Sequence, residues 1–383
     1  MSFLQRYSNL IAAIATIASC DVALGFTFQL LPLLMEQQHI PASIIGLNTA
    51  MGPLGILLAG PILPRIIGRI GPKNMAYCAV AFIIASLIIF KSTNSLYIWF
   101  PLRFLFGISI GALFTISEAW ILTFAEKGNR GRIMGIYTSV MAVTFSVGPF
   151  MLPFTGTAGW LPWLIGILCL CVSTLPLAFV TVDSDMFHDE KGGNFLRVIK
   201  RAPLLLFAVA SATLFDSVFI SFFTIFGLRS GLSLQEASWV LGGGIIGNLL
   251  FLSAIGFLAD KWSRIGVVTC AVVTTVVMSI ALIFVVQSWL IWPTVVLMST
   301  AAFSVYVVCL AIMGDTFKGA DLIAGSAAFS AMWGVGGLVG PPVVGAAIDR
   351  FGVNAMPMAL AAFYVILLIG LAFSGGRLIR DAP

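Results

Sequence analysis

The sequence predicts an all-α integral membrane protein with twelve transmembrane helices in two pseudo-symmetric six-helix bundles. Of its 383 residues, 60% are hydrophobic and only 9% are charged, whereas soluble domains carry roughly 25% charged residues. This much apolar surface needs lipid as its solvent. A repeat supports two bundles, because Asp21 and Asp216 each lie within an apolar stretch, and each is followed 48 positions later by Arg-Ile-Gly, at Arg69 and Arg264.

Twelve apolar stretches are long enough to cross a bilayer, which takes about 20 residues as a helix. The first begins near residue 9 and is too long for the apolar region of a signal peptide, so we expect it to be a retained helix. The expected spans are 9–34, 43–63, 73–91, 97–123, 132–153, 160–181, 203–227, 237–258, 265–286, 289–312, 323–347 and 354–375.

A polar segment separates the sixth span from the seventh. Residues 182–201 carry mixed charge and a Gly-Gly pair, which is typical of a linker. We therefore expect an N-terminal six-helix bundle at 1–181, a cytoplasmic linker at 182–201 and a C-terminal bundle at 202–383. The repeat of about 195 residues is far too long for a solenoid. It favours two bundles related by an axis along the membrane normal.

Lys and Arg residues set the topology. With both termini inside, the cytoplasmic side holds 16 of the 20 basic residues, as the positive-inside rule requires. The net charge of +5 therefore reflects topology in a bacterial inner membrane. A nucleic-acid-binding function would need a basic soluble face, and no segment offers one.

Asp21 and Asp216 are the first candidates for chemistry. A carboxylate at the bilayer centre costs roughly 2.5–3.5 kcal/mol on insertion scales, so such residues are rare and usually functional. Desolvation should raise their affinity for protons. The small residues Ala18 and Gly25 next to Asp21 should allow close approach of another helix or a ligand. The alternative is a structural carboxylate bonded to a neighbouring helix.

Arg103 and Glu118 both lie on the fourth span, roughly 22 Å apart along its axis. Their directions differ by about 60°, so both side chains can face a central cavity. Arg103 is placed to neutralise Asp21 or to hold an anionic group, and Glu118 lies toward the cytoplasm. The alternatives are a snorkelling arginine and a glutamate near a helix end.

Further polar and aromatic residues fall inside the spans. Gln29, Asn48 and Asn248 are substrate contacts or interhelical hydrogen-bonding groups. The rings of Phe28, Phe219, Phe223 and Trp333 are candidates for cavity lining. The other tryptophans near the outer ends of spans are expected at the lipid interface, as Trp99, Trp160, Trp163, Trp239, Trp289 and Trp292.

Several patterns are missing from the sequence. It has no P-loop for ATP and no His/Cys cluster for a metal, so we expect neither a cofactor nor a bound metal. No paired nucleophile and base appears, so an enzyme is not expected. The six cysteines all fall within spans, and we expect them to be reduced.

Three motifs resemble those of the major facilitator superfamily, over the whole chain. The segment GFLADKWSR, with Gly256, Asp260, Lys261 and Arg264, resembles the family's loop signature. The second motif is RFLFGISIGALF in the fourth span, and the third is GVGGLVGPPVVG in the eleventh span. The stretch ending ISEAW, with PRIIGRIGPKN, is most similar to the YcaD-like branch, and in outline to bacterial copper and riboflavin importers.

The resemblance implies a cytoplasmic gate at the two related loops. Its residues would be Arg65, Arg69, Gly256, Asp260, Lys261 and Arg264. The first loop departs from the pattern, because Pro64 or Arg65 stands where the signature has an acid. Only Asp260 can therefore latch the gate.

The resulting prediction is a monomeric, proton-coupled secondary active transporter that works by alternating access. Its partners would be protons, the lipid bilayer and a small organic substrate of amphipathic or planar shape. One alternative is an importer of a vitamin such as riboflavin or of a metal complex. Another is a non-transporting membrane receptor or scaffold, which would need no intramembrane carboxylates.

Overall fold

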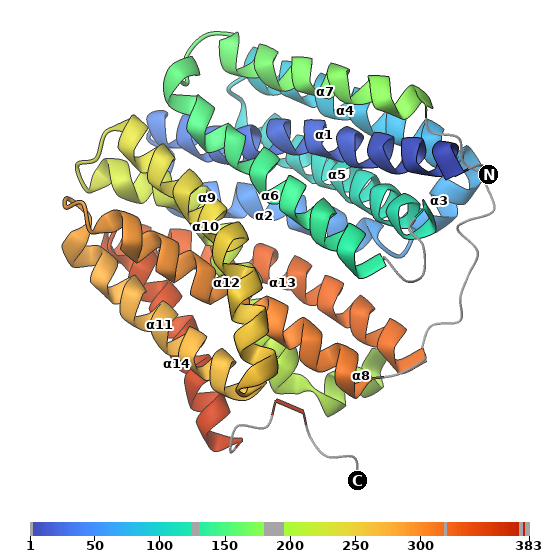
Figure 1. The fold of residues 1–383 in the computed structure, drawn as a ribbon. Coiled ribbons are helices and arrows are strands. Elements are labelled where there is room, and N and C mark those ends of the chain that lie inside the picture. Colours follow the sequence, from blue (N-terminus) through green and yellow to red (C-terminus); the bar gives the residue numbers. More distant parts are fainter. Residues whose placement is uncertain (1–2, 125–129, 180–194, 318–319, 375–377, 380–383) are drawn as a thin grey trace. The chain divides into compact units, whose positions relative to one another are not determined.

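The computed structural model describes residues 3–124, 130–179, 195–317, 320–374 and 378–379. Within these ranges every regular element is a helix (Figure 1). Ten helices in the described residues are long and apolar enough to cross a membrane, and Leu161–Leu175 is a shorter apolar segment.

The helices match the predicted spans closely. Apart from the start of α1, no helix end differs from its predicted position by more than four residues. The first half contains α1 (Phe3–Gln37), α2 (Ala42–Ala59), α3 (Leu63–Ile70), α4 (Pro72–Ser92), α5 (Leu96–Phe124), α6 (Arg130–Thr155) and α7 (Leu161–Phe179). The second half contains α8 (Phe195–Arg201), α9 (Pro203–Arg229), α10 (Leu234–Lys261), α11 (Arg264–Val285), α12 (Ile291–Thr316), α13 (Ala320–Phe351) and α14 (Ala355–Phe373).

Two short helices were not expected from the sequence. α3 replaces most of what we predicted to be a loop, and α8 lies within the predicted linker. In α3, Leu63 and Ile67 are buried while Arg65 and Arg69 are exposed, so the helix separates its apolar and basic faces at a spacing of four residues. An eight-residue helix is too short to show this period clearly in sequence.

The chain forms two compact units. The first contains residues 1–34 and 51–189, and the second contains 35–50 and 190–383. The tip of the α1–α2 hairpin, residues 35–50, thus belongs with the second unit, which no sequence pattern indicated. Residues 182–194 of the predicted linker lie outside the described part of the chain.

Each unit is built from helices that pack side by side. In the second unit α9 packs mainly on α13, and α12 packs on both α10 and α11. In the first unit α4 packs on α5 and α7. There Phe90 meets Trp99 edge-on at 5.6 Å and stacks with Trp163 at 6.5 Å.

These contacts correct one prediction. Trp99 and Trp163 are 1% and 2% exposed, so they pack inside the first unit instead of lying at the lipid interface. The position of a tryptophan near the end of a span does not show whether its ring points toward lipid or into the bundle. Trp160, Trp289 and Trp292 are exposed, as predicted.

The turns between helices follow local chemistry. Gly71 separates α3 from α4 with a φ of 88°, and Gly231 separates α9 from α10 with a φ of 94°; glycine adopts such values without steric cost. α10 begins with a capping box, in which Ser233 and Glu236 exchange hydrogen bonds. Donation from the Ser233 backbone N–H and hydroxyl lowers the pKa of Glu236.

Candidate functional site

Asp21 lies on α1 inside the first unit. Its side chain is 1% exposed, and its Oδ2 is buried without a hydrogen-bond partner. Its neighbour Cys20 donates from Sγ to Ser173 Oγ at 3.4 Å, which fixes this face of α1 against α7. Burying a polar atom without a partner costs free energy. The structure therefore provides no packing reason for a carboxylate here.

The helix next to Asp21 approaches very closely. A Cβ on Gly25 would lie 2.0 Å from the carbonyl oxygen of Phe145, and a Cβ on Gly148 would lie 2.3 Å from the Gly25 backbone. α1 and α6 therefore cross backbone to backbone, which only glycine permits. The predicted close approach at Gly25 is confirmed, and the approaching group is α6.

Two aromatic side chains near the acids were not predicted. Tyr137 on α6 and Trp120 on α5 are 2% and 1% exposed, and neither the Tyr137 hydroxyl nor Trp120 Nε1 has a hydrogen-bond partner. Tyr137 lies close enough to Asp21 and Glu118 for electrostatic interaction with both. A single tyrosine in an apolar helix forms no recognisable sequence motif. Whether its side chain faces the acids depends on the rotation of the helix about its own axis, which the sequence does not show.

Glu118 and Arg103 differ in environment although both lie on α5. Glu118 is exposed, so in a membrane span it must face water or polar groups. Arg103 is buried, at 3% exposure. Its guanidinium carbon lies 5.8 Å from the centre of the Phe28 ring, within the range of a cation–π interaction. This burial disfavours the alternative of an arginine that snorkels to the interface, and the role of Arg103 in the site stays a prediction.

Phe28 and Gln29 continue this polar region along α1. Phe28 is half-buried, and its ring lies 6.1 Å from that of Phe145. Gln29 is 2% exposed. Arg103, Phe28 and Phe145 thus form a cationic and aromatic group about two helical turns beyond Asp21 on α1.

Asp216 occupies the matching position on α9 in the second unit. It is half-buried, whereas Asp21 is almost fully buried. Tyr364 on α14 interacts with it electrostatically, and the Tyr364 hydroxyl donates to the Ala302 carbonyl at 3.1 Å. This tyrosine was also missed by the sequence analysis, for the same reason as Tyr137.

The predicted aromatic lining near Asp216 forms a packed row. Phe215 and Phe219 stack at 5.6 Å, and Phe219 lies 5.0 Å from Phe223. Phe219 and Phe223 are at most 2% exposed. Packing alone accounts for these rings, and their role as cavity lining stays a prediction.

The remaining cavity candidates differ in exposure. Asn48 is fully buried on α2. Asn248 on α10 has a buried Oδ1 without a partner. Trp333 on α13 is 38% exposed, so its ring is accessible. The positions of these three residues do not test their expected roles, which stay predictions.

The loop-signature residues are only partly brought together. Arg264 at the start of α11 forms an ion pair with Asp315 near the end of α12. Lys261 is exposed, with its ammonium 4.5 Å from the centre of the Phe257 ring. Gly256 lies in α10 with open space around it. The Asp260 side chain lies outside the described part, and Asp315 was not predicted.

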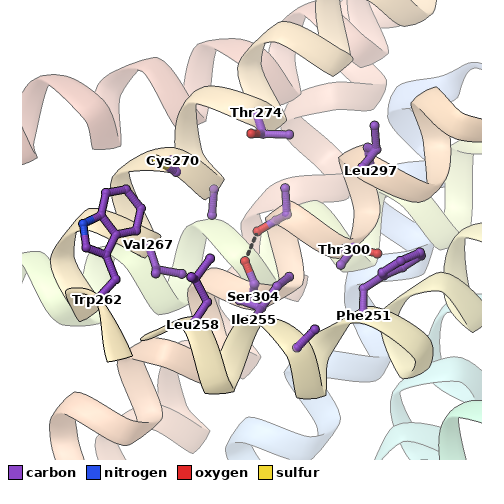
Figure 2. A pocket seen from close by; sticks show the side chains of 13 residues that line it. Phe251, Ile255, Leu258, Trp262, Val267, Cys270, Thr274, Leu297, Thr300 and Ser304 are labelled. Atoms are coloured by element: carbon purple, nitrogen blue, oxygen red, sulfur yellow. Dashed lines mark hydrogen bonds between the residues drawn. The ribbon is translucent and has the colours of Figure 1, made fainter. Parts of the chain in front are cut away.

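A groove opens on the second unit between α10, α11 and α12, with a volume of about 340 Å³ (Figure 2). Phe251, Leu258 and Leu297 line it and are themselves exposed. Its Ser304 hydroxyl donates to the Ala301 carbonyl at 2.7 Å. None of the predicted site residues lines it. Its apolar, exposed wall fits contact with lipid chains better than binding of a polar solute.

Among the described residues, no set of three or more His, Cys, Asp or Glu side chains is arranged to hold a metal ion. All six cysteines are free.

Fold and site together define an all-helical, multi-pass membrane protein with ionisable groups inside its spans. The family model described as Major Facilitator Superfamily matches residues 11–233 and 205–378. The chain belongs to this superfamily, and its fold is the twelve-helix fold of these transporters.

Relatives with assigned names are MFS-type transporters. The chain is 26% identical over 259 residues to the uncharacterized MFS-type transporter YfkF of Bacillus subtilis, which covers 65% of this chain and 66% of that protein. It is 23% identical over 361 residues to the uncharacterized MFS-type transporter YcaD of Escherichia coli, covering 93% of each. The predicted similarity to the YcaD-like branch is confirmed.

Solved structures show the same fold. The nucleoside transporter NupG superposes with a TM-score of 0.78 at 12% identity, covering 97% of this chain and 98% of that one. A bacterial homologue of the human lysosomal transporter Spinster gives a TM-score of 0.76 at 16% identity, covering all of both chains. At these identities the similarity concerns the fold alone.

Proposed function

We propose that the chain is a proton-coupled secondary active transporter of a small organic solute, amphipathic or planar in shape, that works by alternating access as a monomer. The observation that carries the proposal is Asp21, a fully buried intramembrane carboxyl whose Oδ2 has no hydrogen-bond partner. Such a group costs stability. Its presence in both repeats, as Asp21 and Asp216, supports a functional reason for keeping it.

Proton exchange is the chemistry these acids suit best. A buried carboxyl without a counter-charge is held more easily as the neutral acid, and entry of water favours the charged form. Asp21 and Asp216 would each gain and lose a proton as access changes. Tyr137 and exposed Glu118 lie within electrostatic reach of one another, and they provide a polar path from Asp21 along α5 and α6.

The substrate class follows from the groups beyond Asp21. The Phe28 and Phe145 rings offer flat apolar surface, and Arg103 adds one positive charge beside them. This set suits a planar solute with a polar or anionic edge better than a sugar acid, which needs many hydrogen-bond donors and acceptors.

On the cytoplasmic side, we assign the gate to α3, which carries Arg65 and Arg69, and to the α10–α11 junction with Lys261 and Arg264. The ion pair of Arg264 with Asp315 supports this assignment in the second unit. Asp260 would complete the gate. The distribution of Lys and Arg supports an inner-membrane location with both termini in the cytoplasm, which fusion of a cytoplasm-dependent fluorescent protein to each terminus would test.

The coupling proposal is tested in proteoliposomes that contain a pH-sensitive dye. A thermal-shift screen, in which a ligand of the folded form raises apparent stability, first selects a solute and includes flavins to test the importer alternative. We expect Asp21→Asn and Asp216→Asn to abolish solute-driven proton movement. The control Glu236→Gln changes an exposed acid outside the spans and should leave coupling intact. Wild-type proton movement in both Asn variants would refute the proposal.

A further inference from the structure

The tip of the α1–α2 hairpin is attached to the second unit by two carboxylates and one guanidinium. Glu36 lies at the end of α1, and Arg229 is the last residue of α9. Arg229 Nε donates to Glu36 Oε1, and Nη2 donates to Oε2, both at 2.7 Å. This is the two-point geometry that makes arginine–carboxylate pairs directional.

The second carboxylate binds the start of a helix. Asp349, near the end of α13, accepts hydrogen bonds from the backbone N–H groups of Ala42 at 2.8 Å and Ser43 at 2.9 Å. These N–H groups belong to the first turn of α2, where they have no partner within the helix. A negative charge there is further favoured by the helix dipole. Arg229 interacts electrostatically with Asp349 as well as with Glu36.

At Gly46 and Gly345, the backbones of α2 and α13 are in direct contact. A Cβ on Gly46 of α2 would lie 2.1 Å from the Pro341 carbonyl oxygen, and one on Gly345 of α13 would lie 2.2 Å from that of Ala42. Ile45, in the same turn of α2, is fully buried. The backbones of α2 and α13 are therefore closely fitted where Gly46 and Gly345 lie.

We propose that Glu36, Arg229 and Asp349 form an outer clasp that holds residues 35–50 on the second unit and releases them during the transport cycle. This inference rests on the proposed alternating access, because such a cycle requires the outer end to open. The remaining parts of α1 and α2 belong to the first unit, and all the residues of the clasp lie within the second.

The chemistry of the clasp suits repeated release. Side chains of Glu36 and Arg229 are 18% and 35% exposed, so water can replace their partners when they separate. An ion pair at this exposure stabilises the closed form only modestly. Breaking it should shift the equilibrium between closed and open forms roughly two- to fivefold. The glycine contact has no interlocking side chains at its closest points, so it can part and re-form without rotamer changes.

The clasp is tested by thiol accessibility. In a variant with all six native cysteines replaced, Ile45→Cys places a reporter at a fully buried position of residues 35–50, and a membrane-impermeant maleimide measures how often this position becomes accessible to water. We expect slow labelling with the intact clasp. Arg229→Gln or Asp349→Asn should speed labelling severalfold, and the exchanged pair Glu36→Arg with Arg229→Glu should partly restore protection.

Matched controls separate the clasp from general loosening. Arg350→Gln removes the neighbouring basic residue, whose guanidinium lies by Phe351, and should leave labelling unchanged. Gln38→Cys, in the exposed turn between α1 and α2, should label rapidly in every variant and shows that the reagent reaches the protein. Melting temperatures of all variants identify any that fail to fold, and Arg229→Lys then replaces Arg229→Gln.

Two outcomes would overturn the inference. One is equal labelling of Ile45→Cys with and without Arg229→Gln and Asp349→Asn. The other is equal acceleration by Arg350→Gln. Labelling requires neither a substrate nor a proton gradient, so failure of proton coupling in the liposome assay leaves the clasp result standing, and failure of the clasp leaves proton coupling standing.

Discussion

Asp21 and Asp216 occupy matching positions in the two repeats, yet their surroundings differ. Asp21 is 1% exposed beside a crossing of α1 and α6 in which two glycines meet. Asp216 is half-buried beside a row of phenylalanines. The same residue at matching positions of the repeat therefore has two environments. Duplication preserved the acid, while the packing around it diverged.

The difference in packing extends to two glycine–proline pairs, Gly148-Pro149 on α6 and Gly340-Pro341 on α13. A Cβ on Gly148 would lie 2.3 Å from the backbone of Gly25. A Cβ on Gly340 would lie 2.7 Å from Cγ of the Leu214 side chain. Position 148 is thus rigid against substitution, whereas at position 340 the nearest atom belongs to a side chain, which can move aside.

Substituting these glycines should give the largest effect. We expect Gly148→Ala to lower the free energy of unfolding by about 3 kcal/mol, the upper part of the usual range for overpacking. Gly340→Ala should cost clearly less, because Leu214 can change rotamer. Gly52→Ala, where a Cβ would meet nothing within 4 Å, should be neutral or stabilising. Melting temperatures in one detergent measure all three, and equal losses at 148 and 340 would remove the contrast.

Replacing each acid by leucine tests how much the burial of its carboxyl group lowers the stability of the folded protein. We expect Asp21→Leu to stabilise the protein by roughly 1–3 kcal/mol, because it removes a buried oxygen without a partner. Asp216→Leu should gain little, since its carboxyl is already partly exposed. Thermal unfolding compares the two variants. A stabilisation at Asp216 that matched or exceeded that at Asp21 would contradict the assigned environments.

Removing the hydroxyl group of Tyr137 or Tyr364 should have a smaller effect, and it provides a further comparison of the two acid sites. Tyr364→Phe should cost about 1 kcal/mol, because it breaks the hydrogen bond to Ala302. Tyr137→Phe should cost nothing in stability, because its hydroxyl has no partner. In the liposome assay Tyr137→Phe should still slow proton movement, since it changes the group between Asp21 and Glu118. A stability loss at Tyr137 without a transport effect would assign it a structural role.

Most of the helices could be predicted from the sequence, because a membrane span needs only length and apolarity. The repeat was visible in the same way, through Asp21, Asp216 and the Arg-Ile-Gly triplets. α3 could not be found, since Leu63 and Ile67 alone do not define a period. Membership in the superfamily followed from the loop signature around Asp260.

The site was less predictable, because it depends on how each helix is turned. Tyr137 and Tyr364 resemble any other aromatic residue in an apolar span. The clasp joins residues 193 and 307 positions apart in the sequence. One clue was available, since Arg229 is one of few basic residues on the predicted outer side, and a charge there against the positive-inside rule needs a partner such as Glu36.

The free cysteines have a practical consequence. No disulfide joins any part of the chain, and Cys78, Cys171 and Cys270 are exposed on helix surfaces. Thiol-reactive probes that reach these helix surfaces should therefore modify these three positions before the buried Cys20 and Cys309.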